Sequence, residues 1–476
     1  MIKVKRKEGF ILRVTRVLRE PTRDSLDLYL YVPDELGLNT NVIAEDLFYH
    51  SAIHSRRTYF SAEHQLPLVR SRLEGRGRLD PERYRLSMSL YAFQFVTAQE
   101  QSSRYIIERF RDEGSENDAS PQELSEHIEL IESILRRVRR NQPTEDGLTK
   151  YFANIDNYIS WFTQQEMLAI SAELPGGPRY QEVRQKIMTL CECEEKHRTE
   201  RQYNSERATA SPTRISNKMR LLRRLIEFPV TLKDKPKELG GGEQRAVKAL
   251  VTGLVMMVIS ALVLELHVVF SNVTIWFLLA LAVLYAMREI FKDDLRQTLW
   301  RWLRKGRPKW RRRYRDPERG TLVGSQREWF DFKKSSRMPE EVRRARRSNV
   351  SQRSETVLHY RSRAQMLPTR FLSGYHQTRE TLTLDLELLT SLMEQGSHRI
   401  FLMEEGEVTS RQVEKRYQFN LLARSQQGGH DADIQRWKIV LNRSRILDVE
   451  EIPLFEDDTA RVNEKSSKAN EMVEHP

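Results

Sequence analysis

Three groups of histidine, cysteine and acidic residues could in principle bind a metal or transfer protons. His50 and His54 are four residues apart, and His64 follows. On a helix this spacing places two imidazoles on one face, as in paired zinc ligands. However, no nearby acid has the spacing of a metalloprotease helix, and the local sequence FYHSAIHSRR predicts an exposed strand or turn. We therefore interpret these histidines as surface residues and predict no metal site here.

The other two groups carry a weaker signal. Cys191, Cys193 and His197 lie close together, but helical residues two positions apart face about 200° away from each other. A zinc site also needs a second pair of ligands at a defined spacing, which the sequence does not offer. His430 and Asp431 resemble an acid–base pair, yet they lie in a glycine-rich turn that favours a solvated surface. The sequence therefore predicts no catalytic residue, metal ligand or cofactor-binding residue.

The element with the strongest sequence signal is an apolar stretch over residues 249–287. It contains one formal charge, Glu265, and one histidine, His267, whereas the whole chain is 31% charged with a mean hydropathy of −0.63. The stretch is too long for one membrane span and suits two, since a span needs roughly 17–25 apolar residues. We predict a transmembrane helical hairpin over residues 249–291, with its turn at Ser271-Asn272.

The charges on either side of this stretch set its expected orientation. Lysine and arginine are frequent before residue 249 and after residue 287, and the connecting tip has neither. By the positive-inside rule, both termini then face the cytoplasm. Two cysteines in 476 residues also fit a reducing compartment without disulfide bonds. We expect an integral protein of the bacterial inner membrane. The alternative is a buried helical pair within a soluble domain.

The side chains within the two predicted spans favour an anchor over a conduction pathway. Away from the tip their polar side chains are three Ser or Thr hydroxyls, and we expect Glu265 and His267 to reach the headgroup layer. Small residues spaced four apart allow two helices to approach closely. We therefore predict that the two spans pack on each other through small residues. These predicted packing residues are Ala249, Gly253, Ala282 and Ala286.

A strongly basic segment follows the predicted hairpin. Residues 288–315 contain 12 Lys or Arg and 3 acids. Because the apolar helical stripe continues past the membrane, we predict a juxtamembrane helix over residues 292–315. Cations beside a span attract an anionic leaflet, and tryptophans suit the headgroup region. Nucleic acid is a weaker interpretation, since it does not explain the position beside a span. The predicted anionic-lipid contacts are Arg296, Arg301, Arg304, Lys305, Arg311, Arg312 and Arg313, and the predicted interfacial aromatics are Trp300, Trp302 and Trp310.

Two soluble segments are expected before the hairpin. Alternating apolar and polar residues predict a small β-rich domain over residues 1–115, including a strand at 84–90. The capping box Ser120-Pro121-Gln122-Glu123 opens a bundle of amphipathic helices over residues 116–228. A linker over residues 229–248 then leads to the membrane.

One soluble segment is expected after the hairpin. Residues 316–456 predict an α+β domain rich in antiparallel strands, with a strand hairpin around Gly428-Gly429. Residues 381–393 fit a strand and a helix equally well, and residues 457–476 predict a disordered tail. The predicted fold class is thus an α+β membrane protein with an N-terminal small sheet plus helical bundle, a two-helix transmembrane hairpin and a C-terminal α+β domain.

These features favour binding over catalysis. We predict a membrane-anchored scaffold or regulatory interaction protein whose soluble domains face the cytoplasm, bind anionic lipids and engage an unidentified cytoplasmic protein. A second copy of the chain is a further candidate partner. Two alternatives stay open: a membrane-tethered enzyme whose site is assembled from residues distant in sequence, and an oligomeric effector that permeabilises the bilayer.

Overall fold

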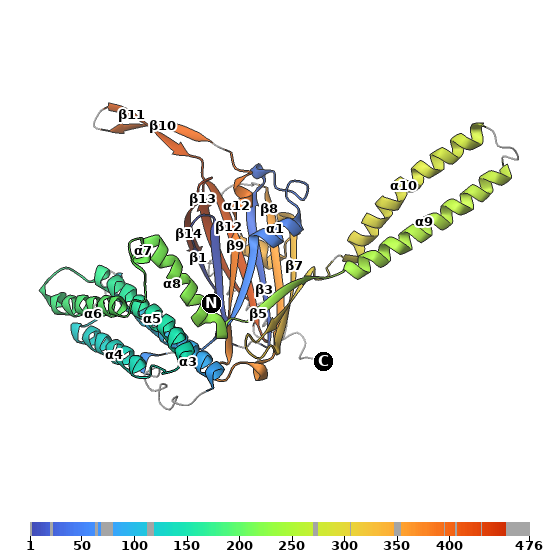
Figure 1. The fold of residues 1–476 in the computed structure, drawn as a ribbon. Coiled ribbons are helices and arrows are strands. Elements are labelled where there is room, and N and C mark those ends of the chain that lie inside the picture. Colours follow the sequence, from blue (N-terminus) through green and yellow to red (C-terminus); the bar gives the residue numbers. More distant parts are fainter. Residues whose placement is uncertain are drawn as a thin grey trace, which may run out of the picture.

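Two antiparallel sheets pack face to face at the centre of the molecule (Figure 1). This computed structural model describes residues 2–19, 22–61, 65–67, 80–111, 119–269, 275–304, 306–346, 354–394, 396–404, 407–429 and 431–453. The smaller sheet contains, in spatial order, β1 (Ile2–Arg6), β2 (Ile11–Leu18), β9 (Gln377–Asp385) and β4 (Ile53–Phe60). The larger sheet contains, in spatial order, β14 (Ile446–Ile452), β13 (Asp433–Leu441), β12 (Tyr417–Gln427), β3 (Arg23–Pro33), β8 (Glu355–Met366), β7 (Leu322–Lys334), β6 (Trp310–Arg315) and β5 (Lys233–Glu238).

Alternation along the strands directs one face of each sheet into a shared core. Successive side chains of a strand point to opposite faces. In β2, Leu12 and Val14 are buried while Ile11, Arg13 and Thr15 are partly exposed. Phe419 and Leu421 of β12 are fully buried in the same core. The apolar face of each sheet therefore covers that of the other, which is the condition for a stable sandwich.

The strands before and after the helix pair belong to the same two sheets. β3 pairs with both β8 and β12, and β2 pairs with β9. The predicted division into a β-rich domain at 1–115 and a separate domain at 316–456 is therefore corrected, because the two segments share one sandwich. Pairing between distant segments leaves no local pattern in a sequence. The predicted mixture of helices with antiparallel sheets is confirmed.

A helical bundle packs beside the sandwich (Figure 1). Its helices are α3 (Pro81–Arg111), α4 (Pro121–Arg140), α5 (Asp146–Glu173), α6 (Gln181–Glu200), α7 (Glu206–Thr209) and α8 (Pro212–Glu227). The predicted capping box is present: the Ser120 side chain accepts a hydrogen bond from the Glu123 backbone N–H at 3.1 Å. The strand predicted at 84–90 lies instead within α3. Helical spacing overrides the local alternation there, because Tyr84, Met88 and Tyr91 are all buried in the bundle core.

A pair of helices, α9 (Gly241–Val269) and α10 (Ile275–Arg304), is inserted between β5 and β6. β5 and β6 are hydrogen-bonded neighbours, from Lys233 opposite Arg315 to Glu238 opposite Trp310. In Figure 1 the pair projects away from the sandwich. Two boundaries are corrected. The predicted linker at 229–248 contains β5 and the first turns of α9. The predicted basic helix at 292–315 ends at Arg304, and its last residues form β6.

Shorter elements complete the fold. β10 (Ser397–Glu404) and β11 (Glu407–Glu414) form a separate two-stranded hairpin that extends from the sandwich (Figure 1). The ambiguous residues 381–393 contain the end of β9 followed by the short helix α12 (Glu387–Thr390). β12 and β13 form the predicted antiparallel hairpin. The predictions for Ser271-Asn272 and for 457–476 fall outside the described residues. The remaining elements are η1 (Asp34–Leu36), α1 (Glu45–Ala52), η2 (Pro178–Tyr180), η3 (Phe228–Val230), η4 (Ser335–Arg337), α11 (Glu340–Arg346), η5 (Pro368–Arg370) and α12 (Glu387–Thr390).

Candidate membrane interface and the ionic cluster behind it

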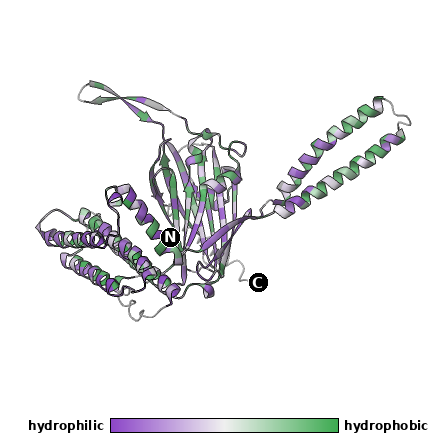
Figure 2. Cartoon of the chain, viewed as in Figure 1, coloured by the Kyte–Doolittle hydropathy of each residue, from purple (hydrophilic) through white to green (hydrophobic). Residues whose placement is uncertain are grey.

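The helix pair presents hydrocarbon to its surroundings. Met257 and Leu264 of α9 are each 69% exposed, and Val268 is 80% exposed. Figure 2 shows hydrophobic residues along α9 and along the half of α10 that is farther from the sandwich. Among the helices of the described part of the chain, one, Gly241–Val268, is long and apolar enough to cross a membrane. Exposed apolar surface on this scale marks an interaction site.

The contact between the two helices uses larger side chains than predicted. Val247, Val251 and Val255 of α9 are buried at every fourth position, and they pack with Leu299 and Leu303 of α10. An apolar groove of about 310 Å³ between the helices is lined by residues of both. The predicted packing residues lie on exposed faces, so the contact runs along a different face of each helix. These exposed residues are Ala249, Gly253, Ala282 and Ala286.

The two helices differ in how far their apolar segments extend. In α10 the uncharged segment Ile275–Met287 has 13 residues, which span about 20 Å as a helix. This is less than the roughly 30 Å of a hydrocarbon core. Arg288, Lys292 and Arg296 then recur at every fourth position, and all three are only partly exposed. The same face continues to Leu299, so these cations lie on the side of α10 that faces α9.

A compact junction joins the helix pair to the sandwich. Gly240, at the start of α9, has a φ of 97°, a left-handed conformation that glycine adopts without strain. A Cβ at this position would approach the Trp300 ring to 3.1 Å. The Arg304 guanidinium lies over the same ring at 5.5 Å and forms an ion pair with Glu238 at 3.4 Å. The tryptophan thus fills the space where the chain leaves β5 and enters α9.

The residues predicted to contact anionic lipids occupy several environments. Arg313 is exposed, Arg311 is half-buried, and Arg296 is 3.8 Å from the Asp293 carboxylate. Of the predicted aromatics, Trp302 is 69% exposed. Lys305 and the Arg301 side chain lie outside the described residues.

One predicted interfacial aromatic, Trp310, and one predicted lipid contact, Arg312, lie inside the protein. Trp310 is fully buried and stacks on the Tyr49 ring, with the ring centroids 3.6 Å apart. Arg312 is 6% exposed. Both belong to β6, where alternation places them on the inward face with Tyr314, whereas Arg313 points outward. These two predictions are corrected, since a helix was expected where the chain forms a strand.

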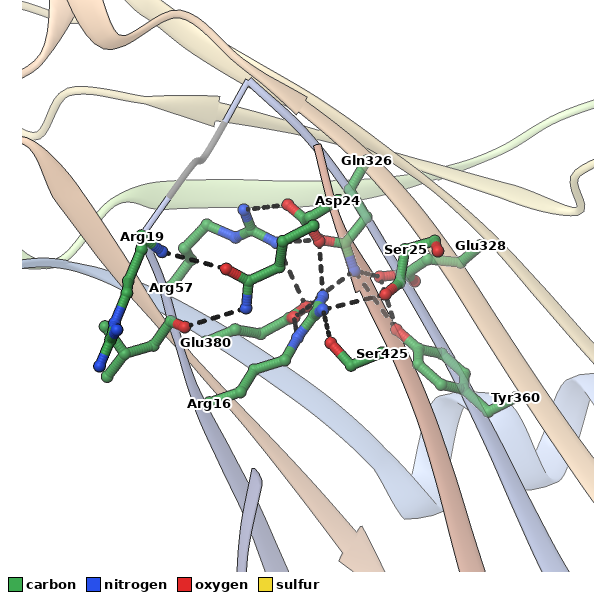
Figure 3. Close-up of polar contacts among 12 residues, drawn as sticks. Arg16, Arg19, Asp24, Ser25, Arg57, Gln326, Glu328, Tyr360, Glu380 and Ser425 are labelled. Atoms are coloured by element: carbon green, nitrogen blue, oxygen red, sulfur yellow. Dashed lines mark hydrogen bonds and ion pairs between the residues drawn. The ribbon is translucent and has the colours of Figure 1, made fainter. Parts of the chain in front are cut away.

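Arg312 belongs to a cluster of charged residues buried between the two sheets. Figure 3 shows the part of this cluster around Arg16, Arg57 and Glu380. In its first half, Arg16 of β2 contacts Asp24 of β3 at 2.5 Å and Glu380 of β9 at 2.6 Å. Arg57 of β4 contacts the same two carboxylates at 3.1 and 3.4 Å. All four side chains are at most 2% exposed. Two guanidinium groups thus bridge two carboxylates across the interior of the sandwich.

The second half of the cluster extends to the strands that hold the helix pair. Gln326 of β7 donates to Glu328 at 2.9 Å and to Glu380 at 3.2 Å, which joins the two halves. Arg312 of β6 then contacts Glu328 at 2.8 Å and Asp234 of β5 at 2.7 Å. The Tyr49 hydroxyl also donates to Glu328. Through Asp234 and Arg312, both strands flanking the helix pair are tied to the centre of the sandwich.

The electrostatics of the cluster favour a structural role. Burial alone would raise the pKa of Glu380, but Arg16 and Arg57 outweigh it and lower that pKa to about 2. Burial raises the pKa of Glu328, with Arg312 and Tyr49 acting in the opposite direction. Buried charges are tolerated only where they are paired and hydrogen-bonded, as here. A cluster enclosed in this way holds the two sheets and β6 in register, and it offers no open face to a substrate.

The candidate metal and acid–base residues are dispersed in the structure. His50, on α1, and His54, at the start of β4, are both exposed. Cys191 is buried while Cys193 is exposed, and the His197 ring contacts the Asp156 carboxylate at 2.8 Å. Within the described residues, no group of three His, Cys, Asp or Glu side chains could hold a metal ion. His64 and His430 lie outside the described residues.

The sequence contains a signal for the ionic cluster that residue spacing alone did not reveal. Each member occupies a strand position in phase with buried apolar neighbours. Arg16 alternates with Val14 and Leu18, and Arg57 alternates with Tyr59. Glu380 likewise alternates with Leu382. A charged residue on the apolar face of a strand predicts a buried partner of opposite charge.

Comparisons of this chain with protein-family models, curated proteins and solved structures found no match. Its function is therefore inferred from its own geometry.

Proposed function

We propose that this protein is a membrane-anchored scaffold or regulatory interaction protein, with α9 and α10 inserted as a hairpin and the sandwich and bundle on the cytoplasmic side. One observation carries the proposal. An apolar helix pair with exposed side chains projects from a body whose core is otherwise enclosed. A lipid bilayer is the environment in which such a surface is stable, and helices satisfy their own backbone groups there.

Strand pairing supports the placement of both flanks on one side of the membrane. β5 enters the helix pair and β6 leaves it, and the two strands are hydrogen-bonded neighbours. If α9 crosses the bilayer, α10 must therefore return through it. The basic residues at both ends then favour the cytoplasmic side by the positive-inside rule. We propose the bacterial inner membrane as the location.

The shorter apolar segment of α10 can be accommodated within this proposal. Arg288 and Lys292 follow it directly, and both carry long aliphatic stems. Such side chains extend their charged ends toward the headgroups while their stems stay in hydrocarbon. Thinning of the bilayer or tilting of the helices offsets the remaining mismatch.

Two surfaces of the body support an interaction role. Met403 and Val408 on the β10–β11 hairpin are 82% and 73% exposed. An isolated two-stranded hairpin is marginally stable in water, and its open edges suit the addition of a partner strand. A groove of about 390 Å³ between α4 and α6 is lined by three glutamates and one lysine, Lys186, and this net negative charge suits a cationic segment of a partner. The three are Glu129, Glu132 and Glu182.

Cysteine accessibility tests the anchor directly. Cys193 is exposed on α6, and Ile275, at the start of α10, is 78% exposed. The full chain carrying Ile275→Cys is treated in intact spheroplasts with a membrane-impermeant maleimide. We expect labelling at position 275 and none at Cys193, with Cys193 labelled in inverted vesicles. Labelling of Cys193 in intact spheroplasts, or release of the protein by alkaline carbonate, would contradict the proposal.

A further inference from the structure

A row of basic side chains crosses the outer face of the larger sheet next to the helix pair. Lys237 of β5 lies opposite Arg311 of β6, which lies opposite Arg327 of β7, which lies opposite Arg363 of β8. Residues directly opposite on neighbouring strands share a face, and the strands are about 4.8 Å apart. Four cations therefore stand side by side across four strands.

A second, shorter row lies beside the first. Lys235 is opposite Arg313 on the same outward face. No aspartate or glutamate occupies an outward position of β5, of β6, or of β7 between residues 325 and 329. Within the described part of the chain, no carboxylate forms an ion pair with Lys237, Arg311 or Arg327. The Nε atom of Arg311 is buried and has no hydrogen-bond partner among the described residues.

Folding stability does not explain this arrangement. Like charges directly opposite each other on neighbouring strands repel and destabilise a sheet. On the inner face of the same strands, by contrast, Arg312 is paired with two carboxylates. Outward cations in four consecutive strands are therefore arranged to meet negative charge that comes from outside the chain.

The row is continuous with the base of the helix pair. Lys237 lies four residues before the start of α9, and Arg311 lies seven residues after the end of α10. Trp329 lies two residues after Arg327 on the same face of β7, and its indole N–H donates to the carbonyl of Gly306, in the turn that follows α10, at 3.1 Å. The Arg363 guanidinium lies over the Trp329 ring at 5.8 Å. One tryptophan thus fixes the exit from the helix pair to the basic face.

We infer that this row binds the phosphate groups of anionic lipid headgroups on the membrane that α9 enters, with Lys237, Arg311, Arg327 and Arg363 each facing negative charge. The inference rests on the proposed anchor, because the anchor brings the row to the bilayer surface. Arg and Lys side chains are suited to phosphate oxygens, and several cations acting together select a polyanionic surface over a single anion. Bound headgroups also relieve the repulsion along the row.

Lysine reactivity provides the test. The full chain is reconstituted into phosphatidylcholine nanodiscs with and without about 20 mol % phosphatidylglycerol, and exposed amines are acetylated and quantified by mass spectrometry. We expect acetylation of Lys235 and Lys237 to slow roughly threefold or more in the anionic discs, and to recover in about 0.5 M NaCl. Lys150 of α5, exposed on the bundle, is the internal reference and should react equally in both. Equal reactivity of Lys237 in the two kinds of disc would overturn the inference.

A variant pair separates the row from general basicity. Arg327→Gln/Arg363→Gln should abolish most of the protection of Lys237 without lowering the thermal midpoint in neutral detergent, since it removes like-charge neighbours. Arg399→Gln/Arg443→Gln removes the same charge from exposed positions on β10 and beyond β13, and it should keep the protection. Protection that survives in the first pair would contradict the inference.

Two further measurements distinguish the other outcomes. Binding of a fluorescent oligonucleotide of about 20 nucleotides to the protein in phosphatidylcholine discs, weakened by Arg327→Gln/Arg363→Gln, would reassign the row to nucleic acid and overturn the lipid proposal. Failure of the anchor itself appears as carbonate extraction of the protein. A protein that resists extraction but shows no protection of Lys237 refutes the present inference alone.

Discussion

The interior of the sandwich and the surface of the helix pair place charge and hydrocarbon in opposite ways. The sandwich buries charge, with Arg57 and Glu380 at most 1% exposed. The helix pair exposes hydrocarbon, with Val268 80% exposed. A buried charge without a partner is unfavourable, and so is a large apolar surface exposed to water. The ionic cluster finds its partners inside the chain. The exposed apolar side chains of the helix pair are not covered by the described part of the chain, and this is the observation behind the proposed membrane anchor.

Breaking the ionic cluster should have the largest effect. Arg57→Met removes one of the two cations that bridge Asp24 and Glu380, and it leaves two buried carboxylates with Arg16 alone. We expect a loss of about 3–5 kcal/mol in the free energy of unfolding. Urea unfolding of the protein in detergent, followed by tryptophan fluorescence, measures it.

The neighbouring residue supplies the matched control. Arg56 has a side chain 50% exposed and pairs with Glu227 at 2.8 Å. Because exposed ion pairs contribute about 0–1 kcal/mol, Arg56→Met should change the midpoint little. Equal losses for the two variants would mean that the buried cluster does not hold the sheets together.

Acid sharpens the comparison, because it acts on the paired charges and leaves the hydrocarbon unchanged. The pKa of Glu380 is about 2 in the folded protein, below its ordinary value of 4.5. The ionised form therefore favours folding, and this contribution is present above pH 4.5 and is lost as the pH falls toward 2. The contribution is on the order of 3 kcal/mol, from roughly 1.4 kcal/mol per pKa unit.

The variant Glu380→Gln lacks this titration. It should be less stable than the natural chain near neutral pH, and the difference between the two should shrink as the pH approaches 2. Urea midpoints measured over this range check the expectation. A stability difference that stays constant across the range would exclude Glu380 as the titrating group.

A charge placed on α9 tests the role of the exposed apolar surface of the helix pair. Val258 is 57% exposed near the middle of the apolar segment. Lysine at the centre of a span costs about 3 kcal/mol of insertion free energy, so Val258→Lys should reduce the carbonate-resistant fraction. Val408→Lys places the same charge on the 73% exposed Val408 of the β10–β11 hairpin and should leave that fraction unchanged. If both variants resist carbonate extraction as the natural chain does, the proposed insertion of α9 in a bilayer is contradicted.

The sequence predicted the features that depend on neighbouring residues. The capping box before α4, the amphipathic bundle helices and the hairpin of β12 and β13 each have a short-range pattern, and each is present. The helical structure of residues 249–269 and 275–291 follows from the same kind of pattern. In these cases adjacent residues carry the whole signal.

Features that depend on distant pairing were missed. The pairing of β3 with β8 and β12 joins segments that the sequence analysis assigned to different domains. Arg312 was expected at the lipid surface because it follows other arginines, and only the inward face of β6 reveals its partners. The basic residues of 288–315 look alike in the sequence but occupy three environments: the side of α10 that faces α9, the ionic cluster and the basic outer face.

The smallest expected effect on stability belongs to the β10–β11 hairpin, which exposes apolar side chains to water. Met403 is 82% exposed, so Met403→Asp should change the free energy of unfolding by less than about 0.5 kcal/mol. If the hairpin docks a cytoplasmic protein, the same variant should lose that protein from detergent-solubilised complexes, because a charge in the centre of a docking surface is strongly unfavourable. Gln412→Asp, at an exposed position of β11, should retain it. Co-purified proteins compared between the two variants decide the matter: identical sets would remove the hairpin from the interaction surface and leave the groove between α4 and α6 as the next surface to alter.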